Sequence, residues 1–329
     1  MATIKDVAKL AAVNPSTVSR VIADNPKITK ETKERVYAAM KELKYRPNAI
    51  ARSLANQSCT KIIGIILPSD NEALFHNPFF TKVISSVSAY AQNRGYYIMH
   101  GHSADEDGEL KILKDLVNSR WVDGMILTTA REDDRCIEYL NKVNMPFVVI
   151  GKVDDGVEAY TVDNDNTAAM YDATKYMMEK GHRRICFIGG SLEFRVNKER
   201  LLGYKNAMKD SGIEINDNMV YTFEDSEICG KQGMEKFLKY FIPDAIVTTD
   251  DLIAYGACQH GYDTIGEYVP VVGFNNTPVS VYRHPQFSTV EIFADKLGHH
   301  SAKTLIDLLE GNEIAEKHFN VETKFFDRT

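Results

Sequence analysis

The chain has 329 residues, of which 44% are apolar and 26% are charged. This composition is typical of globular proteins, excludes a mostly disordered chain and predicts about two domains. The apolar runs are far shorter than the ~18 residues that span a bilayer, and the N-terminus lacks the apolar core of a secretory signal. We therefore expect a cytoplasmic protein with no membrane partner.

The charge is unevenly distributed along the chain. Residues 1–60 carry 11 basic and 5 acidic side chains, although the net charge of the whole chain is −7. A small basic segment on an acidic body is typical of a nucleic-acid-binding protein with a separate second domain.

The basic segment has the start signals of three short helices. Thr3 and Asp6 form a capping-box pattern, and Asn14 followed by Pro15 suits the start of a second helix. Thr29 caps a third helix with an apolar inner stripe. Two short helices joined by a tight turn and closed by a third predict a small all-α helix-turn-helix head. The spacing alone leaves open a generic three-helix bundle with a solvated polar face.

In a helix-turn-helix, the second helix lies in the major groove with its first residues nearest the bases. Pro15 and Ser16 would then approach base edges, and Arg20 is the candidate for a bidentate guanine contact. Three further polar side chains suit phosphate contacts, which position a protein without reading sequence: Asn14, Thr17 and Ser19.

Residues 3–55 closely resemble the lactose/galactose-repressor family of bacterial transcription regulators. The resemblance rests on three runs: Thr3-Ile4-Lys5-Asp6-Val7-Ala8, Val13-Asn14-Pro15-Ser16-Thr17-Val18-Ser19-Arg20-Val21, and Tyr45-Arg46-Pro47-Asn48-Ala49-Ile50-Ala51-Arg52-Ser53-Leu54. Ala12 departs from the glycine common at this turn, and alanine tolerates a positive φ poorly. The resemblance implies a DNA-binding domain over residues 1–47 and a hinge helix with linker over 48–60.

The hinge completes the candidate DNA-binding set. In the family, the hinge helix folds on operator DNA, paired with its twin from a second subunit. Leu54 stands where the family inserts an apolar wedge into the minor groove, which kinks a base step. The resemblance adds Asn48 and Ala51 of the hinge, and Thr3 of the head, to the DNA contacts. Without it, Leu54 would be interpreted as a linker residue packed on the body.

Residues 61–329 alternate short apolar runs with amphipathic stretches, which predicts βαβ units and parallel sheets. There are too many units for one sheet, so we expect two doubly wound parallel-sheet subdomains with a crossover near Asp163-Asn164-Asp165. The predicted strands are 61–67, 96–100, 124–127, 147–150, 184–188, 245–248 and 271–274. The predicted helices are 78–94, 109–119, 136–143, 167–180, 198–211, 230–240 and 252–260.

This body resembles the family's effector-binding and dimerisation core, which is similar to periplasmic sugar-binding proteins. The matching stretches include Val122–Leu127, Lys180–Ile185, Arg200–Tyr204 and Val271–Asn276. In the family the chain crosses between subdomains three times, and we place the crossings near residues 161–162, 290–291 and 318–319. The first subdomain would then comprise about 61–161 and 291–318, including a returning helix at 294–310. The second would comprise about 162–290 and 319–329.

Ligands of such folds bind at the carboxyl ends of the strands. A sugar needs an aromatic platform and polar groups for its hydroxyls. Ser69 and Asp70 follow the first strand, and Phe79 or Phe80 could supply the platform. The resemblance implies five more ligand-binding positions: Thr128, Gly151, Arg200, Asp250 and Asn275. Gly151 and Asn275 lack the acid found in some relatives, which favours a neutral ligand.

Each of these residues has a structural alternative. Phe79 or Phe80 could be a core aromatic, Arg200 could pair with Glu199 on the surface, and Asp250 could only cap the helix after it. The acidic residues at 163 and 165 are expected to cap or to bind solvent, which argues against a hydrolase.

Motifs of the common enzyme and metal classes are absent from the sequence. There is no GxxxxGK[ST], no GxGxxG after a strand and no HExxH. The five cysteines are scattered without CxxC pairs, which indicates reduced thiols. The sequence therefore predicts no enzyme, no metal and no cofactor.

Taken together, the sequence predicts a transcriptional repressor that binds a near-palindromic operator as a homodimer and responds to a small neutral sugar. Within the family the chain is most similar to repressors of maltose operons, through Asn77-Pro78-Phe79-Phe80 and Gly273-Phe274-Asn275-Asn276. We therefore expect maltose or a related α-glucoside as inducer. Another sugar or a corepressor is the alternative within the family. A sugar-binding receptor without DNA function is the alternative from another class.

Overall fold

The computed structural model describes residues 2–22, 24–45, 59–68, 78–224 and 226–328. The chain divides into two compact units, a head of residues 1–60 and a body of residues 61–329, and each is described by itself. The predicted hinge residues Asn48, Ala51 and Leu54, and the predicted ligand residues Ser69 and Asp70, lie outside the described residues.

The head is a helix-turn-helix with a third helix closing its core. Its helices are α1 (Ile4–Leu10), α2 (Pro15–Ile22) and α3 (Lys30–Glu42). Val7, Val18, Val21 and Val36 from the three helices are fully buried against one another. The turn between α1 and α2 passes through Ala12 at φ +54°, which is the left-handed conformation that alanine adopts at a cost.

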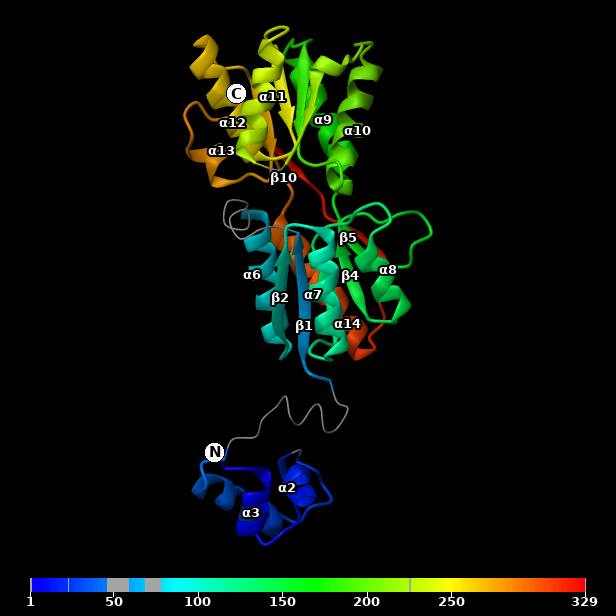
Figure 1. Cartoon of the computed structure of the whole chain (residues 1–329), viewed down its shortest axis with the longest axis vertical. Coiled ribbons are helices and arrows are strands. Elements are labelled where there is room, and N and C mark those ends of the chain that lie inside the picture. The colour runs from blue at the N-terminus through cyan, green and yellow to red at the C-terminus, as the bar shows by residue number, and fades with distance from the viewer. Residues whose placement is uncertain (1, 23, 46–58, 69–77, 225, 329) are drawn as a thin grey trace. The chain divides into compact units, whose positions relative to one another are not determined.

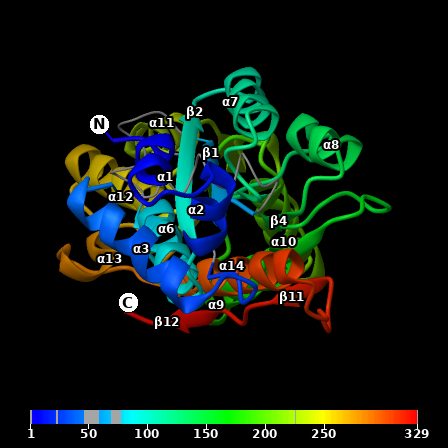
Figure 2. The ribbon, with the colours of Figure 1, turned by 90° about the horizontal axis from the view of Figure 1, so that it is seen from below.

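The body contains two subdomains, each built on a six-stranded sheet (Figure 1). The first sheet is parallel throughout, in the order β11-β5-β4-β3-β1-β2. Figure 2 shows α7 and α8 on one face of it and α6 and α14 on the other. Its strands are β1 (Ile62–Pro68), β2 (Tyr97–Ser103), β3 (Gly124–Leu127), β4 (Phe147–Ile150), β5 (Tyr160–Asp163) and β11 (His318–Asn320). Its helices are α6 (Pro78–Asn93), α7 (Glu106–Asn118), α8 (Arg135–Lys142) and α14 (Ala294–Glu310).

The second sheet has the order β12-β10-β9-β8-β6-β7, with only β12 antiparallel to its neighbour among the described strands. Helices α9 and α10 pack together, as do α11 and α12. Its strands are β6 (Ile185–Gly189), β7 (Val220–Thr222), β8 (Ala245–Thr248), β9 (Val271–Phe274), β10 (Ser288–Glu291) and β12 (Lys324–Phe326). Its helices are α9 (Asn166–Glu179), α10 (Arg195–Asp210), η1 (Asp217–Met219), α11 (Glu227–Leu238), α12 (Asp251–Ile265) and α13 (Pro278–Tyr282).

The predicted fold class, a helix-turn-helix head with two doubly wound subdomains, is confirmed. The long apolar runs form the predicted strands because they are buried on both faces of a sheet covered by helices. Five short strands that the periodicity did not predict complete the sheets: β5, β7, β10, β11 and β12.

The chain crosses between the subdomains three times; the first crossing falls in the predicted Asp163-Asn164-Asp165 segment, and all three lie slightly later than the positions expected from the family. β5 stays in the first sheet through Asp163, β10 stays in the second through Glu291, and β11 stays in the first through Asn320. Backbone pairing with the neighbouring strand extends each segment beyond the point where its apolar pattern ends. The crossings therefore lie at 164–165, 292–293 and 321–323.

Asn164 ties the three crossings together. It lies in the first crossing, and its side-chain Nδ2 donates to the carbonyl of Ile292 in the second at 3.2 Å and to that of Val321 in the third at 2.7 Å. The Val321 N–H donates back to the Asp163 carbonyl at 2.7 Å. One buried amide therefore joins all three connections between the subdomains.

Candidate nucleic-acid interface and ligand cavity

The head begins with the predicted capping box. The Thr3 N–H donates to Asp6 Oδ2 at 2.8 Å, and the Asp6 N–H donates to Thr3 Oγ1 at 3.3 Å. The hydrogen bonds that the Thr3 N–H and the Thr3 hydroxyl donate to the Asp6 carboxylate lower its pKa. Thr3 is exposed, so the cap holds the start of α1 at the surface of the head.

Helix α2 presents polar side chains on one face and apolar side chains on the other. Val18 and Val21 are buried in the head, which turns the rest of the helix outward. The predicted DNA contacts on and beside it are exposed at Asn14, Pro15, Ser16 and Arg20, and half-buried at Thr17 and Ser19. The geometry thus places an arginine and small polar groups on the exposed side of one short helix and at its start.

The body contains a cavity of about 160 Å³ between its two subdomains. Residues that follow strands of both sheets form its wall, as the rule for parallel sheets requires. Of the nine predicted ligand residues, seven line this cavity: Phe79, Phe80, Thr128, Gly151, Arg200, Asp250 and Asn275. The structure therefore brings together every predicted ligand residue that it describes.

Arg200 is buried in the cavity wall, with 5% of its surface exposed. Its Nε donates to Asn166 Oδ1 at 3.0 Å and its NH1 donates to the Thr249 carbonyl at 2.6 Å. The guanidinium lies over the Phe274 ring, 4.3 Å from the centroid. Arg200 is therefore not the surface residue of the structural alternative, and Glu199 Oε1 lies 4.0 Å from Lys152 Nζ.

Asp250 both caps α12 and faces the cavity. Its Oδ1 accepts from the Leu252 N–H at 2.7 Å, and its Oδ2 accepts from Asn275 Nδ2 at 2.6 Å. Burial, followed by the nearby charge of Asp251, raises the pKa of Asp250 to about 7. Its carboxyl group is therefore easier to protonate than that of an ordinary aspartate, while both of its oxygens accept hydrogen bonds in this structure.

Aromatic and polar groups share the other side of the cavity. Phe79 and Phe80, at the start of α6, meet edge to face with centroids 5.1 Å apart, and both also pack on the core. Thr128 follows β3 and donates its hydroxyl to the Ile66 carbonyl at 2.9 Å. Gly151 follows β4 at φ +122°, a conformation that favours glycine.

Several cavity residues escaped the sequence analysis. Asp163 was assigned to capping or solvent, but only Asp165 caps α9, accepting from the Ala168 N–H at 2.8 Å. Asp163 lines the cavity, and burial, followed by the charge of Glu199, raises its pKa to about 7. Asp163 ends β5, and strand ends line such cavities. Because β5 was not predicted, this position was not recognised as a strand end. Arg195 and Asn166 were also missed.

A second, larger cavity of about 490 Å³ adjoins the first. The two share five lining residues, Lys152, Asp163, Asn164, Asn166 and Glu199. The two cavities therefore meet at Asp163 and its neighbours.

Among the described residues, no cluster of His, Cys, Asp and Glu has the arrangement of a metal site. No helix in the described part of the chain is long and apolar enough to cross a bilayer.

Comparisons with known proteins agree with both units. The family described as bacterial regulatory proteins, lacI family, matches residues 3–48. The family described as periplasmic binding proteins and sugar binding domain of LacI family matches residues 60–329. The HTH-type transcriptional regulator MalR of Streptococcus pneumoniae is 39% identical over 325 residues, which cover 94% of each chain.

Solved structures share the whole architecture. A complex of the transcriptional regulator CelR with cellobiose is 27% identical, with a TM-score of 0.76 over 100% of this chain and 99% of the other. The lac repressor dimer bound to operator and the anti-inducer ONPF is 22% identical, with a TM-score of 0.84 over 99% of this chain and 98% of the other. At that identity the second likeness concerns the fold.

Proposed function

Because the chain belongs to the lacI family of bacterial regulatory proteins, which are transcription regulators and not enzymes, we propose that it represses a sugar-utilisation operon and leaves its operator when a sugar binds. The observation that carries the proposal is the cavity between the two subdomains, lined by strand ends of both, in a chain with a helix-turn-helix head.

The head would recognise a near-palindromic operator as part of a homodimer. Two identical heads related by a two-fold axis read two half-sites, so operator symmetry mirrors protein symmetry. Arg20 would contact a guanine, while Asn14, Thr17 and Ser19 contact phosphates. Thr3 at the helix start and the hinge residues Asn48, Ala51 and Leu54 would add contacts, with Leu54 entering the minor groove at the centre of the site.

The cavity suits a neutral polyhydroxylated ligand. Phe79 and Phe80 offer apolar faces for a sugar ring, and Arg200, Asp250 and Asn275 offer donors and acceptors for its hydroxyls. Thr128, Gly151 and, beyond the described residues, Ser69 and Asp70 would complete the contacts. The wall carries both cations, Arg195 and Arg200, and carboxyl groups, Asp163 and Asp250, and this balance suits an uncharged effector.

Maltose or a related α-glucoside is the effector that we propose. The 39% identity to a regulator named MalR supports this choice. The second cavity beside the first also supports a ligand of more than one ring. A corepressor or another sugar is the alternative within the family.

The sugar would act as a switch by preferring one arrangement of the subdomains. A ligand shifts such an equilibrium only by its difference in affinity for the two states. Rotation about the crossings held by Asn164 would separate the two hinges of the dimer and weaken their hold on the operator.

The test is fluorescence anisotropy of the full chain on a labelled fragment of its own promoter, at one salt concentration because phosphate contacts depend on salt. Maltose, maltotriose, glucose, sucrose, trehalose, galactose and ribose are titrated, and unrelated DNA of equal length is the control. Release by maltose or maltotriose alone is expected. Binding that no sugar disturbs would overturn the sugar and keep the DNA-binding function, and absence of specific binding would overturn the repressor. Sedimentation at twice the chain mass of 37.1 kDa tests the dimer.

A further inference from the structure

Helix α10 begins with a sequence that does not suit a helix start. Phe194 at the N-cap makes no side-chain hydrogen bond, the first turn has no acidic residue, and Arg195 and Lys198 stand there instead. Cations are unfavourable at this end because the helix dipole is positive there. These two cations are unfavourable at the helix start and gain nothing there. We therefore expect them to make a contact elsewhere in the molecule.

That contact lies across the cleft, in the first subdomain. Arg195 NH1 pairs with Asp154, which follows β4, and Lys198 pairs with Glu132 at 2.5 Å. The backbone N–H of Arg195 also donates to the Ala130 carbonyl at 3.0 Å. The first turn of α10 therefore joins the two subdomains directly, in addition to the three crossings.

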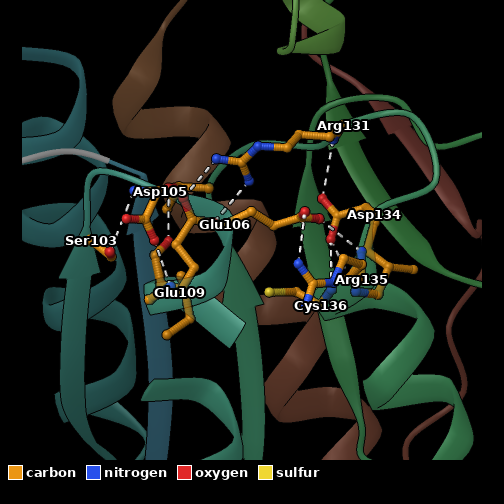
Figure 3. Close-up of polar contacts among 12 residues, drawn as sticks. Ser103, Asp105, Glu106, Glu109, Arg131, Asp134, Arg135 and Cys136 are labelled. Atoms are coloured by element: carbon orange, nitrogen blue, oxygen red, sulfur yellow. Dashed lines mark hydrogen bonds and ion pairs between the residues drawn. The ribbon is translucent and has the colours of Figure 1, made fainter. Parts of the chain in front are cut away.

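The first subdomain holds its side of this contact rigidly. Arg131 makes two hydrogen bonds to the buried Glu109 of α7, at 2.8 and 2.7 Å, and its N–H donates to Asp134 at 3.1 Å (Figure 3). The Asp133 N–H donates to Asp154 Oδ2 at 3.1 Å. Asp154 is thus held in place on the subdomain that Arg195 reaches.

Arg195 also lines the cavity between the subdomains. Two buried side-chain atoms have no hydrogen-bond partner within the described structure, Arg195 Nε and Asn275 Oδ1, and both residues line the cavity between the subdomains. The amide of Asn275 is oriented by its bond from Nδ2 to Asp250, so its oxygen is the atom left over. Buried polar atoms are almost always paired, so an unpaired donor and an unpaired acceptor in one cavity call for a ligand with both functions.

We propose that Arg195 is a ligand-binding latch, in which one guanidinium donates from Nε to a sugar hydroxyl oxygen and from NH1 to Asp154 across the cleft. The inference rests on the proposed function, since it names a further contact of the same ligand. A hydroxyl group fits because it accepts from Arg195 and donates to Asn275. A carboxylate or a fully ionised phosphate group offers only acceptors and leaves Asn275 Oδ1 unpaired. Ligand binding then fixes the guanidinium that holds the cleft closed.

Calorimetric titration of maltose into the full chain separates the two roles. Arg195→Lys keeps the charge that faces Asp154 but loses the Nε donor, and we expect at least a tenfold loss of affinity. Asp154→Asn keeps the donor and weakens the latch, with an expected loss of three- to fivefold. Lys198→Met removes a cross-cleft pair without touching the cavity and is the matched control, expected to stay within twofold.

Monodeoxy maltoses identify the contact itself. One of them is expected to bind wild type several-fold more weakly than maltose, yet to bind Arg195→Lys as well as maltose does. If every analogue loses affinity relative to maltose by the same factor for wild type and for Arg195→Lys, Arg195 contacts no hydroxyl and the proposal is wrong. Circular dichroism and operator affinity confirm that each variant is folded.

A wild type that binds no maltose would overturn the proposed effector and not the latch. Hydrogen exchange in the sugar-free chain then tests the latch, because the Arg195 N–H bonds across the cleft. Asp154→Asn is expected to speed exchange in the peptide 192–200 more than Lys198→Met does. Equal protection in the two variants would refute the latch.

Discussion

Replacing Asn164 by alanine removes the two hydrogen bonds that join the three crossings. The carbonyls of Ile292 and Val321 then lose the donor described for them, and both residues are more than 95% buried. Leaving a buried acceptor unpaired costs about 1–3 kcal/mol, so the pair costs about 2–4 kcal/mol once the longer bond at 3.2 Å is given less weight. For a body of this size that corresponds to a melting temperature lower by roughly 4–7 °C.

Urea unfolding followed by circular dichroism measures the loss, with Asn141→Ala as the matched control. Asn141 is exposed on α8, and its replacement is expected to change the free energy of unfolding by no more than about 0.5 kcal/mol. If the free energy of unfolding of Asn164→Ala is less than about 1 kcal/mol below that of Asn141→Ala, the two carbonyls have hydrogen-bond partners without Asn164. The description of this residue as the tie between the crossings would then be wrong.

Four further changes test other parts of the molecule. Arg20→Ala should relax discrimination at one base pair per half-site by about 1–3 kcal/mol, measured by competition among operator variants; unchanged discrimination rejects the guanine contact. Leu54→Ala should weaken operator binding in anisotropy while circular dichroism shows a folded body, and normal affinity would mean that Leu54 is no wedge. Arg200→Met should abolish the response to sugar and keep sugar-free operator affinity, and a retained response would place the site elsewhere. The raised pKa of about 7 at Asp163 and at Asp250 means that the folded state holds protons which the unfolded state releases, so the contribution of these two groups to stability should fall as the pH rises from about 4 to about 7. Asp163→Asn should therefore gain stability over wild type between pH 5.5 and 7.5 in urea unfolding, and a constant difference would contradict the shift.

The fold was predictable where burial alone decides the sequence. Strands β8 and β9 have the predicted bounds because each is an apolar run buried on both faces. Strand β10 was missed because it begins with Ser288 and Thr289, which are polar and yet fully buried. Their hydroxyls bond to the Arg328 N–H and to Asp251, partners that only the tertiary structure supplies.

The cavity was predictable to the extent that strand ends define it. Thr128 and Asn275 were implied by the family resemblance, and each follows an apolar run that forms a strand of the structure. Arg195 could not be found in this way, because its partner Asp154 lies 41 residues earlier in the chain. The cation at the start of α10 was the one local sign of a functional role for Arg195. It could be interpreted only once the structure placed Asp154 on the opposite wall of the cleft.

The order in which the sheets receive their strands has a consequence for the timing of synthesis. The head is built from one continuous segment that ends at α3, whereas both sheets of the body take an edge strand from residues 318–326. A ribosome adds about 5–20 residues per second, so the ~280 residues between these points take roughly 15–55 seconds. During that interval each newly made chain carries a head with its own core while neither half of the sensor is complete. Every molecule thus passes through a period in which its DNA-reading unit can exist without the unit that regulates it.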